Sequence, residues 1–122
     1  MIVRRTLVAA CVALTLGAGT AQAQSYPSRV IKLVVPFTPG SPNDVMARLL
    51  TQHLAPRLGQ PIIIENRPGA GGLIAGDYVA RSAPDGHTLF VGSNASILLG
   101  PMTMPKPPYQ WDKVFAPVST LA

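Results

Sequence analysis

Cysteine is almost absent from this chain of 122 residues, and histidine is scarce. The one cysteine, Cys11, lies in an N-terminal segment that we expect to be removed, so the remaining chain has no thiol for a disulfide or a metal site. The two histidines, His53 and His87, have no motif partner, and no metal-ligand spacing occurs. We therefore predict no metal, no cofactor and no covalent chemistry.

Clustered charge and aromatic residues are also scarce. Ten Lys and Arg residues face five acids, and removal of Arg4 and Arg5 would leave eight against five, a net charge of about +3. The basic residues are scattered, so a nucleic-acid partner is not predicted. The nucleophile motif G-x-S-x-G and the phosphate-binding motif G-x-x-x-x-G-K-[ST] are both absent, which argues against a hydrolase site and a nucleotide site in this sequence.

The first residues have the pattern of an export signal. A basic pair, Arg4 and Arg5, precedes an apolar stretch from Thr6 to Gly19 that is too short to span a bilayer, and Ala21-Gln22-Ala23 forms an A-x-A cleavage site. We predict a signal peptide at residues 1–23, cleaved before Gln24. A membrane anchor is the alternative interpretation of the same stretch.

Hydrophobic patterning after Gln24 alternates between strands and helices. It predicts, in order, a buried strand, an amphipathic helix, a strand with three consecutive isoleucines, a second helix and a short third strand. This β-α-β-α-β order is typical of an α/β fold with a parallel sheet. The predicted elements are Val30–Val35, Asp44–Leu58, Pro61–Glu65, Leu73–Ser82 and Thr88–Val91. We expect Met46, Leu49, Leu50, Leu54 and Leu58 to face inward from the first helix, and Ile74, Tyr78, Val79 and Ala75 from the second.

Signals weaken after Gly92. We expect a helical turn at Ser96–Leu99, a proline-rich loop at Pro101–Pro108 and the start of a fourth strand at Ala116–Leu121. Three apolar strands alone would leave a sheet with uncovered faces and edges. Residues 24–122 are therefore expected to be an incomplete lobe of a longer protein.

Polar turns follow each of the three predicted strands. The carboxyl ends of parallel strands meet at one edge of a sheet, where ligands bind in this class of fold. Small residues there expose backbone N–H groups and side-chain donors, which suits a small anion. The candidate binding residues are Phe37, Thr38, Pro39, Gly40, Ser41 and Asp44 in the first turn, Gly69, Ala70, Gly71 and Gly72 in the second, and Ser93, Asn94 and Ala95 in the third.

The first turn also has a purely structural interpretation. Ser41-Pro42-Asn43-Asp44 fits a capping box, with Ser41 as N-cap, Pro42 at the first helical position and Asp44 reaching back toward the cap. Capping would occupy some of the N–H groups that an anion needs. It leaves free the N–H groups of the preceding Phe37–Gly40 loop.

Several ordered motifs resemble one family of proteins. They are Tyr26-Pro27-Ser28-Arg29, Ile31 to Gly40 with Asp44, Leu58-Gly59-Gln60-Pro61, Glu65-Asn66-Arg67-Pro68 with Gly69 to Gly72, Ala83-Pro84-Asp85-Gly86-His87-Thr88-Leu89, and Phe115-Ala116-Pro117-Val118. With these motifs the chain resembles the TctC, or Bug, solute receptors of the tripartite tricarboxylate transporter family. It departs from their pattern at Ser41, where a second glycine is usual, and at Val114, where an aspartate is common.

The resemblance implies a periplasmic binding protein of the type II, Venus-flytrap kind, of which this chain holds part of the first lobe. It implies a monomer that captures a small carboxylate, such as a di- or tricarboxylate, an amino acid or an aromatic acid, and delivers it to a membrane permease. The first-turn loop, Phe37 to Gly40, would meet the ligand carboxylate. Two alternatives remain at this point: an exported hydrolase with its catalytic residues downstream, and a truncated product that does not fold stably.

Overall fold

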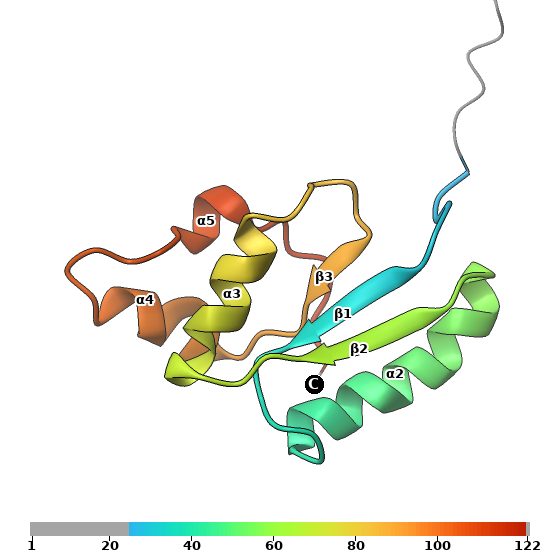
Figure 1. Ribbon diagram of the computed structural model, residues 1–122, viewed down its shortest axis with the longest axis horizontal. Helices are drawn as coiled ribbons and strands as arrows, with labels where there is room; N and C mark the ends of the chain where they lie inside the picture. Colours follow the sequence, from blue (N-terminus) through green and yellow to red (C-terminus); the bar gives the residue numbers. More distant parts are fainter. Residues whose placement is uncertain (1–24, 122) are drawn as a thin grey trace, which may run out of the picture.

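The computed structural model describes residues 25–121, so the predicted signal peptide and its cleavage site lie outside the described residues. The predicted β-α-β-α-β order is confirmed (Figure 1). Within residues 25–121 no helix is long and apolar enough to cross a membrane. The elements are β1 (Ile31–Val35), α2 (Pro42–Leu58), β2 (Ile62–Asn66), the 3₁₀ turn η1 (Ala70–Gly72), α3 (Leu73–Ala80), β3 (Thr88–Phe90), the π-helical turn η2 (Ala95–Leu99), α4 (Gly100–Met102) and α5 (Trp111–Val114).

The three strands form one parallel sheet in the order β2-β1-β3, as the alternation of strands and helices predicts. Leu33, on the central strand, lies opposite Ile64 on one side and Leu89 on the other. Because β1 is central, its residues are the most buried in the sheet, and Val34 and Val35 are fully enclosed. The observed strand ends differ from the predicted ends by at most one residue.

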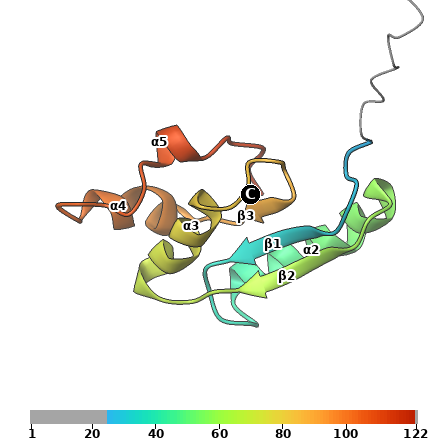
Figure 2. The same ribbon diagram turned by 45° about the horizontal axis from the view of Figure 1, so that its top comes forward.

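Helices α2 and α3 lie on opposite faces of this sheet (Figure 2). On the α2 face, Leu33, Val35, Ala47 and Val91 form the buried core. On the α3 face, Lys32 of β1 donates a hydrogen bond to the hydroxyl of Tyr78, at 2.9 Å. Successive side chains of β1 therefore point alternately toward α2 and toward α3, as the pleat of a strand requires.

The inward face of α2 differs from the predicted stripe. Met46 and Leu49 are 44 % and 47 % exposed, so the prediction that they face the core is wrong. The fully buried positions are Asp44 and Ala47, with Leu54 and Leu58 half-buried behind them. Ala47 packs into the core with Leu33, Val35 and Val91, and the larger Met46 and Leu49 lie on the exposed side of the helix.

Helix α3 shows the same effect. Ile74 is 53 % exposed, so the prediction that it faces inward is wrong, whereas Ala75 is buried as predicted. Leu73 and Gly76 are buried as well. A Cβ atom at Gly76 would overlap the Tyr109 ring and hydroxyl, so the absence of a side chain makes room for this tyrosine. The buried Tyr109 hydroxyl donates to the backbone oxygen of Ser96, at 2.6 Å. Tyr109 thereby ties the C-terminal segment to α3 and η2.

The segment after β3 is irregular apart from short turns. The predicted helical turn is present as η2, and the predicted proline-rich loop begins with α4 and continues without regular structure. The predicted fourth strand at Ala116–Leu121 is wrong, because residues 115–121 pair with no strand of the described chain. Instead Phe115 stacks on Phe90, with ring centroids 5.5 Å apart. An apolar β-type sequence forms no strand here because nothing pairs its backbone.

The contact between Gly76 and Tyr109 yields a stability prediction. Gly76→Ala should lower the free energy of unfolding by about 1–3 kcal/mol, because the added methyl group overpacks a filled site. Denaturant unfolding measures the change. In a Tyr109→Leu background the methyl group has more room, so Gly76→Ala should lower the free energy of unfolding by less. An equal loss of free energy in both backgrounds would contradict the proposed packing.

Candidate functional site

The three polar turns come together at the carboxyl edge of the sheet, around Gly72. An added Cβ at this position would lie 2.5 Å from the Cβ of Ser96 and 3.0 Å from the Cβ of Pro36. Gly72 also has φ +95°, a conformation that side-chain-bearing residues rarely adopt. Glycine is therefore required at the point where the second turn passes between the first and the third.

The first turn is fixed by the start of α2. Ser41 is the N-cap, its Oγ accepts a hydrogen bond from the Asp44 N–H at 3.3 Å, and Pro42 is the first helical residue, as predicted. Asp44 reaches back, but to the Gly40 N–H at 2.9 Å, because the Ser41 N–H donates to the backbone oxygen of Thr38. The predicted capping box thus takes a variant form.

The Asp44 carboxylate is the hub of this turn. It is 1 % exposed and accepts four hydrogen bonds. Arg48 donates two of them, at 2.8 and 3.2 Å, Gly40 donates the third and the amide of Asn66 the fourth, at 2.8 Å. These bonds, led by those from Arg48, hold the pKa of the Asp44 carboxyl well below its usual range. Asp44 is therefore a positioning residue, already saturated by protein donors.

Asn66 joins the first turn to the neighbouring strand. Besides its bond to Asp44, its side-chain amide donates to the backbone oxygen of Phe37, at 3.1 Å. Asn66 is not among the candidate binding residues predicted from the sequence. Its position could have indicated a role, because Asn66 ends β2 directly beside Val35, which ends the parallel strand β1. An amide there can reach both the loop and the helix start.

The loop between β1 and the cap keeps donors free. Within the described chain, the backbone N–H groups of Phe37 and Thr38 have no acceptor. Thr38, Pro39 and Gly40 are exposed and Phe37 is half-buried. The Gly40 and Ser41 N–H groups, by contrast, are occupied. An anion at this turn would therefore meet the loop at Phe37 and Thr38.

The second and third turns complete the edge. Gly69, Ala70 and Gly71 are exposed, with φ values of +133°, +47° and +64°. In the third turn the Ser96 hydroxyl is buried, donating to the Ser93 oxygen and accepting from the Ser93 N–H at 2.9 Å. This arrangement leaves Ser93 half-buried. Asn94 and Ala95 lie beside it at the start of η2.

All thirteen predicted residues therefore lie in turns that meet at one edge, but their roles divide. Asp44 and the Ser41 hydroxyl are used within the protein, whereas the Phe37 and Thr38 N–H groups have no acceptor in the described chain and most of the remaining small residues are exposed. Ser96, which sequence analysis did not include, shapes the third turn. Within residues 25–121 no three His, Cys, Asp or Glu side chains gather in a way that could hold a metal ion.

The saturated Asp44 carboxylate yields a pH prediction. The folded state lowers its pKa below 3.8, so its stabilising contribution is present above that pH and is lost as pH falls toward the folded value. Asp44→Asn should lower the unfolding midpoint at neutral pH, and its difference from the unsubstituted protein should shrink in acid. Chemical denaturation at a series of pH values measures this.

Asp77→Asn is the matched control for that experiment. Asp77 also pairs with an arginine one turn along its helix, Arg81, at 2.9 Å, but on the surface. An exposed pair contributes little, so this variant should change the midpoint far less. Equal effects of the two substitutions would refute a special role for Asp44.

Comparison with known proteins places the chain in a family. A family model described as "Tripartite tricarboxylate transporter family receptor" (TctC) matches residues 46–122. Protein BugT of Bordetella pertussis is 46 % identical over 103 residues, which cover 84 % of this chain and 32 % of that protein. A second relative from the same organism, a UPF0065 protein, is 42 % identical over 113 residues, which cover 91 % of this chain and 35 % of that protein.

A solved structure agrees with both relatives. MatC from Rhodopseudomonas palustris, with bound malate, superposes with a TM-score of 0.74 at 49 % identity, covering 79 % of this chain and 33 % of that one. The chain thus spans about a third of the length of the relatives that it matches. From the family match and these identities, the chain belongs to the tripartite tricarboxylate transporter receptor (TctC) family of solute-binding proteins.

Proposed function

We propose that this chain is the N-terminal part of a periplasmic receptor that captures a small carboxylate for a transporter of the tripartite tricarboxylate type. The observation that carries the proposal is the convergence of three donor-rich turns around Gly72. The malate bound to MatC, 49 % identical to this chain, supports a carboxylate as the ligand class.

The chemistry of the first turn favours a carboxylate held by backbone groups. A carboxylate oxygen accepts hydrogen bonds and gains most from N–H donors that lack another acceptor. Phe37 and Thr38 offer such N–H groups, and the Thr38 side chain adds a hydroxyl. Pro42 has no N–H, and the capping bonds occupy the Asp44 and Gly40 N–H groups, so the loop contributes more than the helix terminus itself.

The other two turns would hold the rest of the ligand. Gly69 to Gly72 allow a ligand to approach the backbone closely, and Ser93 and Asn94 offer hydroxyl and amide groups to further polar atoms. Hydrogen bonds of this kind form and break reversibly and make no covalent bond. They suit capture and release, which is the task of a receptor rather than of an enzyme.

Closure and delivery would depend on parts of the protein beyond this chain. A second lobe would cover the ligand in a hinge movement and would select among di- and tricarboxylates, amino acids and aromatic acids. The receptor would act as a monomer in the periplasm after cleavage before Gln24 and would pass its ligand to a membrane permease.

Binding can be tested on the complete protein by thermal melting against a panel of carboxylates, with malate and citrate among them. At least one carboxylate should raise the melting temperature in a concentration-dependent way, because a ligand that binds only the folded state stabilises it. Lack of stabilisation by every carboxylate at millimolar concentration would contradict the proposal.

Thr38→Val tests the role of the first turn in the same assay. Loss of the hydroxyl should weaken binding by about tenfold, while the melting temperature without ligand stays nearly the same because Thr38 is exposed. Thr103→Val is the control, since among residues 25–121 the Thr103 hydroxyl donates to the Gly100 oxygen alone, far along the chain from the first turn. Equal affinity in the two variants would contradict a ligand contact at Thr38.

A further inference from the structure

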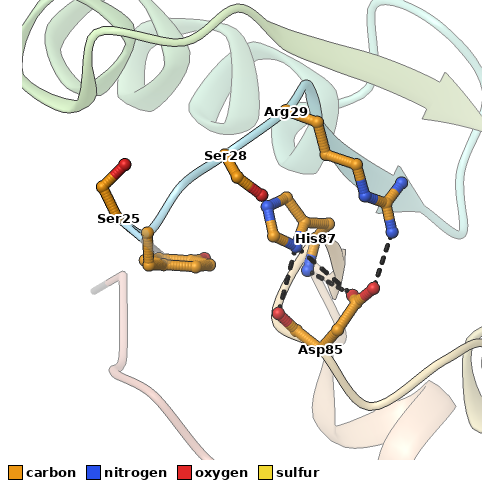
Figure 3. Close-up of a pocket in the computed structure, with 6 residues that line it drawn as sticks. Ser25, Ser28, Arg29, Asp85 and His87 are labelled. Atoms are coloured by element: carbon orange, nitrogen blue, oxygen red, sulfur yellow. Dashed lines mark hydrogen bonds and ion pairs between the residues drawn. The ribbon is translucent and has the colours of Figure 1, made fainter. Parts of the chain in front are cut away.

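A cavity of about 240 Å³ lies at the opposite end of the sheet from the three turns. Its lining comes from two segments that precede strands: residues 25–29 before β1, and the Asp85–His87 loop before β3 (Figure 3). The lining residues are Ser25, Tyr26, Ser28, Arg29, Asp85 and His87. This cavity therefore lies at the amino ends of the strands and plays no part in the proposed carboxylate site.

His87 brings an unpartnered acceptor to this cavity. Its ring is only 7 % exposed, and its Nδ1 lies 3.1 Å from the backbone oxygen of Asp85. A carbonyl oxygen can only accept, so Nδ1 carries the hydrogen and Nε2 of the neutral ring holds a lone pair. Among the described residues Nε2 has no partner, and Figure 3 shows this side of the ring turned toward Ser28. A buried polar atom without a partner is costly.

Arg29 brings a cationic donor to the same cavity. One nitrogen of its guanidinium, Nη2, donates to Asp85 Oδ2 at 2.6 Å, and no other bond of this group occurs within the described chain. The Asp85 carboxylate also accepts from the His87 N–H, and these two bonds hold the pKa of Asp85 below its usual range, the bond from His87 having the larger effect. Asp85 thus stays ionised and paired, while further Arg29 N–H groups remain for a ligand.

We propose that this cavity binds a phosphate group that carries its own proton. The Arg29 donors and the hydroxyls of Ser25 and Ser28 suit its charged oxygens. The Nε2 of His87 is enclosed but unpartnered among the described residues and suits its P–O–H group once a small shift of the cavity lining exposes it. Phosphate near neutral pH has both kinds of oxygen. Sulfate and carboxylates near neutral pH carry no proton and would leave Nε2 unpartnered.

Titration calorimetry of the complete protein at pH 7, with inorganic phosphate and sulfate at equal ionic strength, tests this. Phosphate should bind at least about tenfold more tightly than sulfate, the difference that one hydrogen bond to a buried group makes. Methyl phosphate has lost most of its last proton at pH 7, so it offers no P–O–H group and should bind no more tightly than sulfate. Equal affinity for phosphate and sulfate, or no phosphate binding, would overturn the proposal.

Substitutions of cavity residues test whether phosphate binds at this cavity. His87→Phe keeps a ring but removes the acceptor and should lower phosphate affinity about tenfold or more, and Arg29→Gln, at an exposed position, should do the same without unfolding the protein. His53→Gln, on the exposed side of α2, is the control and should leave affinity unchanged. Unchanged phosphate affinity in Arg29→Gln would overturn the proposal even if His87→Phe fails to fold.

The ring nitrogens of His87 give a readout of the tautomer before any ligand is added. Nitrogen-15 spectra of the imidazoles, with the His87 signals assigned by their loss in His87→Phe, should show His87 as the Nδ1–H tautomer. Phosphate should shift the His87 Nε2 resonance, and sulfate should not. Finding the Nε2–H tautomer for His87 would remove the free acceptor and overturn the proposal.

Discussion

A single buried carboxylate organises the candidate binding edge of this protein. Asp44 lies at the start of α2 with 1 % of its surface exposed, and a charge in that position persists only if donors surround it. Arg48, one helical turn away, supplies two hydrogen bonds, and Asn66, at the end of the neighbouring strand, supplies another. The same carboxylate holds the Gly40 N–H. Helix, loop and sheet edge are thereby fixed to one another.

Small residues then decide how close the elements come. Ala47 sets α2 against the sheet, Gly72 lets the second turn pass between Pro36 and Ser96, and Gly76 admits the Tyr109 ring beside α3. Neither glycine contact tolerates a Cβ atom without movement. The consequence for function is geometric, since residues of three separate turns become neighbours at one edge of the sheet. Carboxylate binding is proposed for that edge because the Phe37 and Thr38 N–H groups have no acceptor in the described chain and the Asp44 carboxylate is already satisfied.

The order and type of the elements could be predicted because local patterns determine them. The β-branched run of β1 and the Ser41-Pro42 start of α2 needed no tertiary information. Which helix residues face the core could not be predicted reliably. Met46 and Ile74 fit an inward stripe by spacing but are exposed, and the small residues Ala47 and Gly76 face the core instead. The partnership of Asp44 with Asn66 joins residues 22 positions apart, which no local motif predicts. The same distinction applies to residues 116–121, whose composition favours a strand but which have no strand beside them in the described chain.

Amide chemical shifts of the isotope-labelled complete protein, followed while a carboxylate is titrated in, show whether the first-turn loop contacts the ligand. The Phe37 and Thr38 amides should shift most, together with amides of the Gly69–Gly72 and Ser93–Ala95 turns. Saturable binding that leaves the Phe37 and Thr38 amides unmoved would contradict this contact.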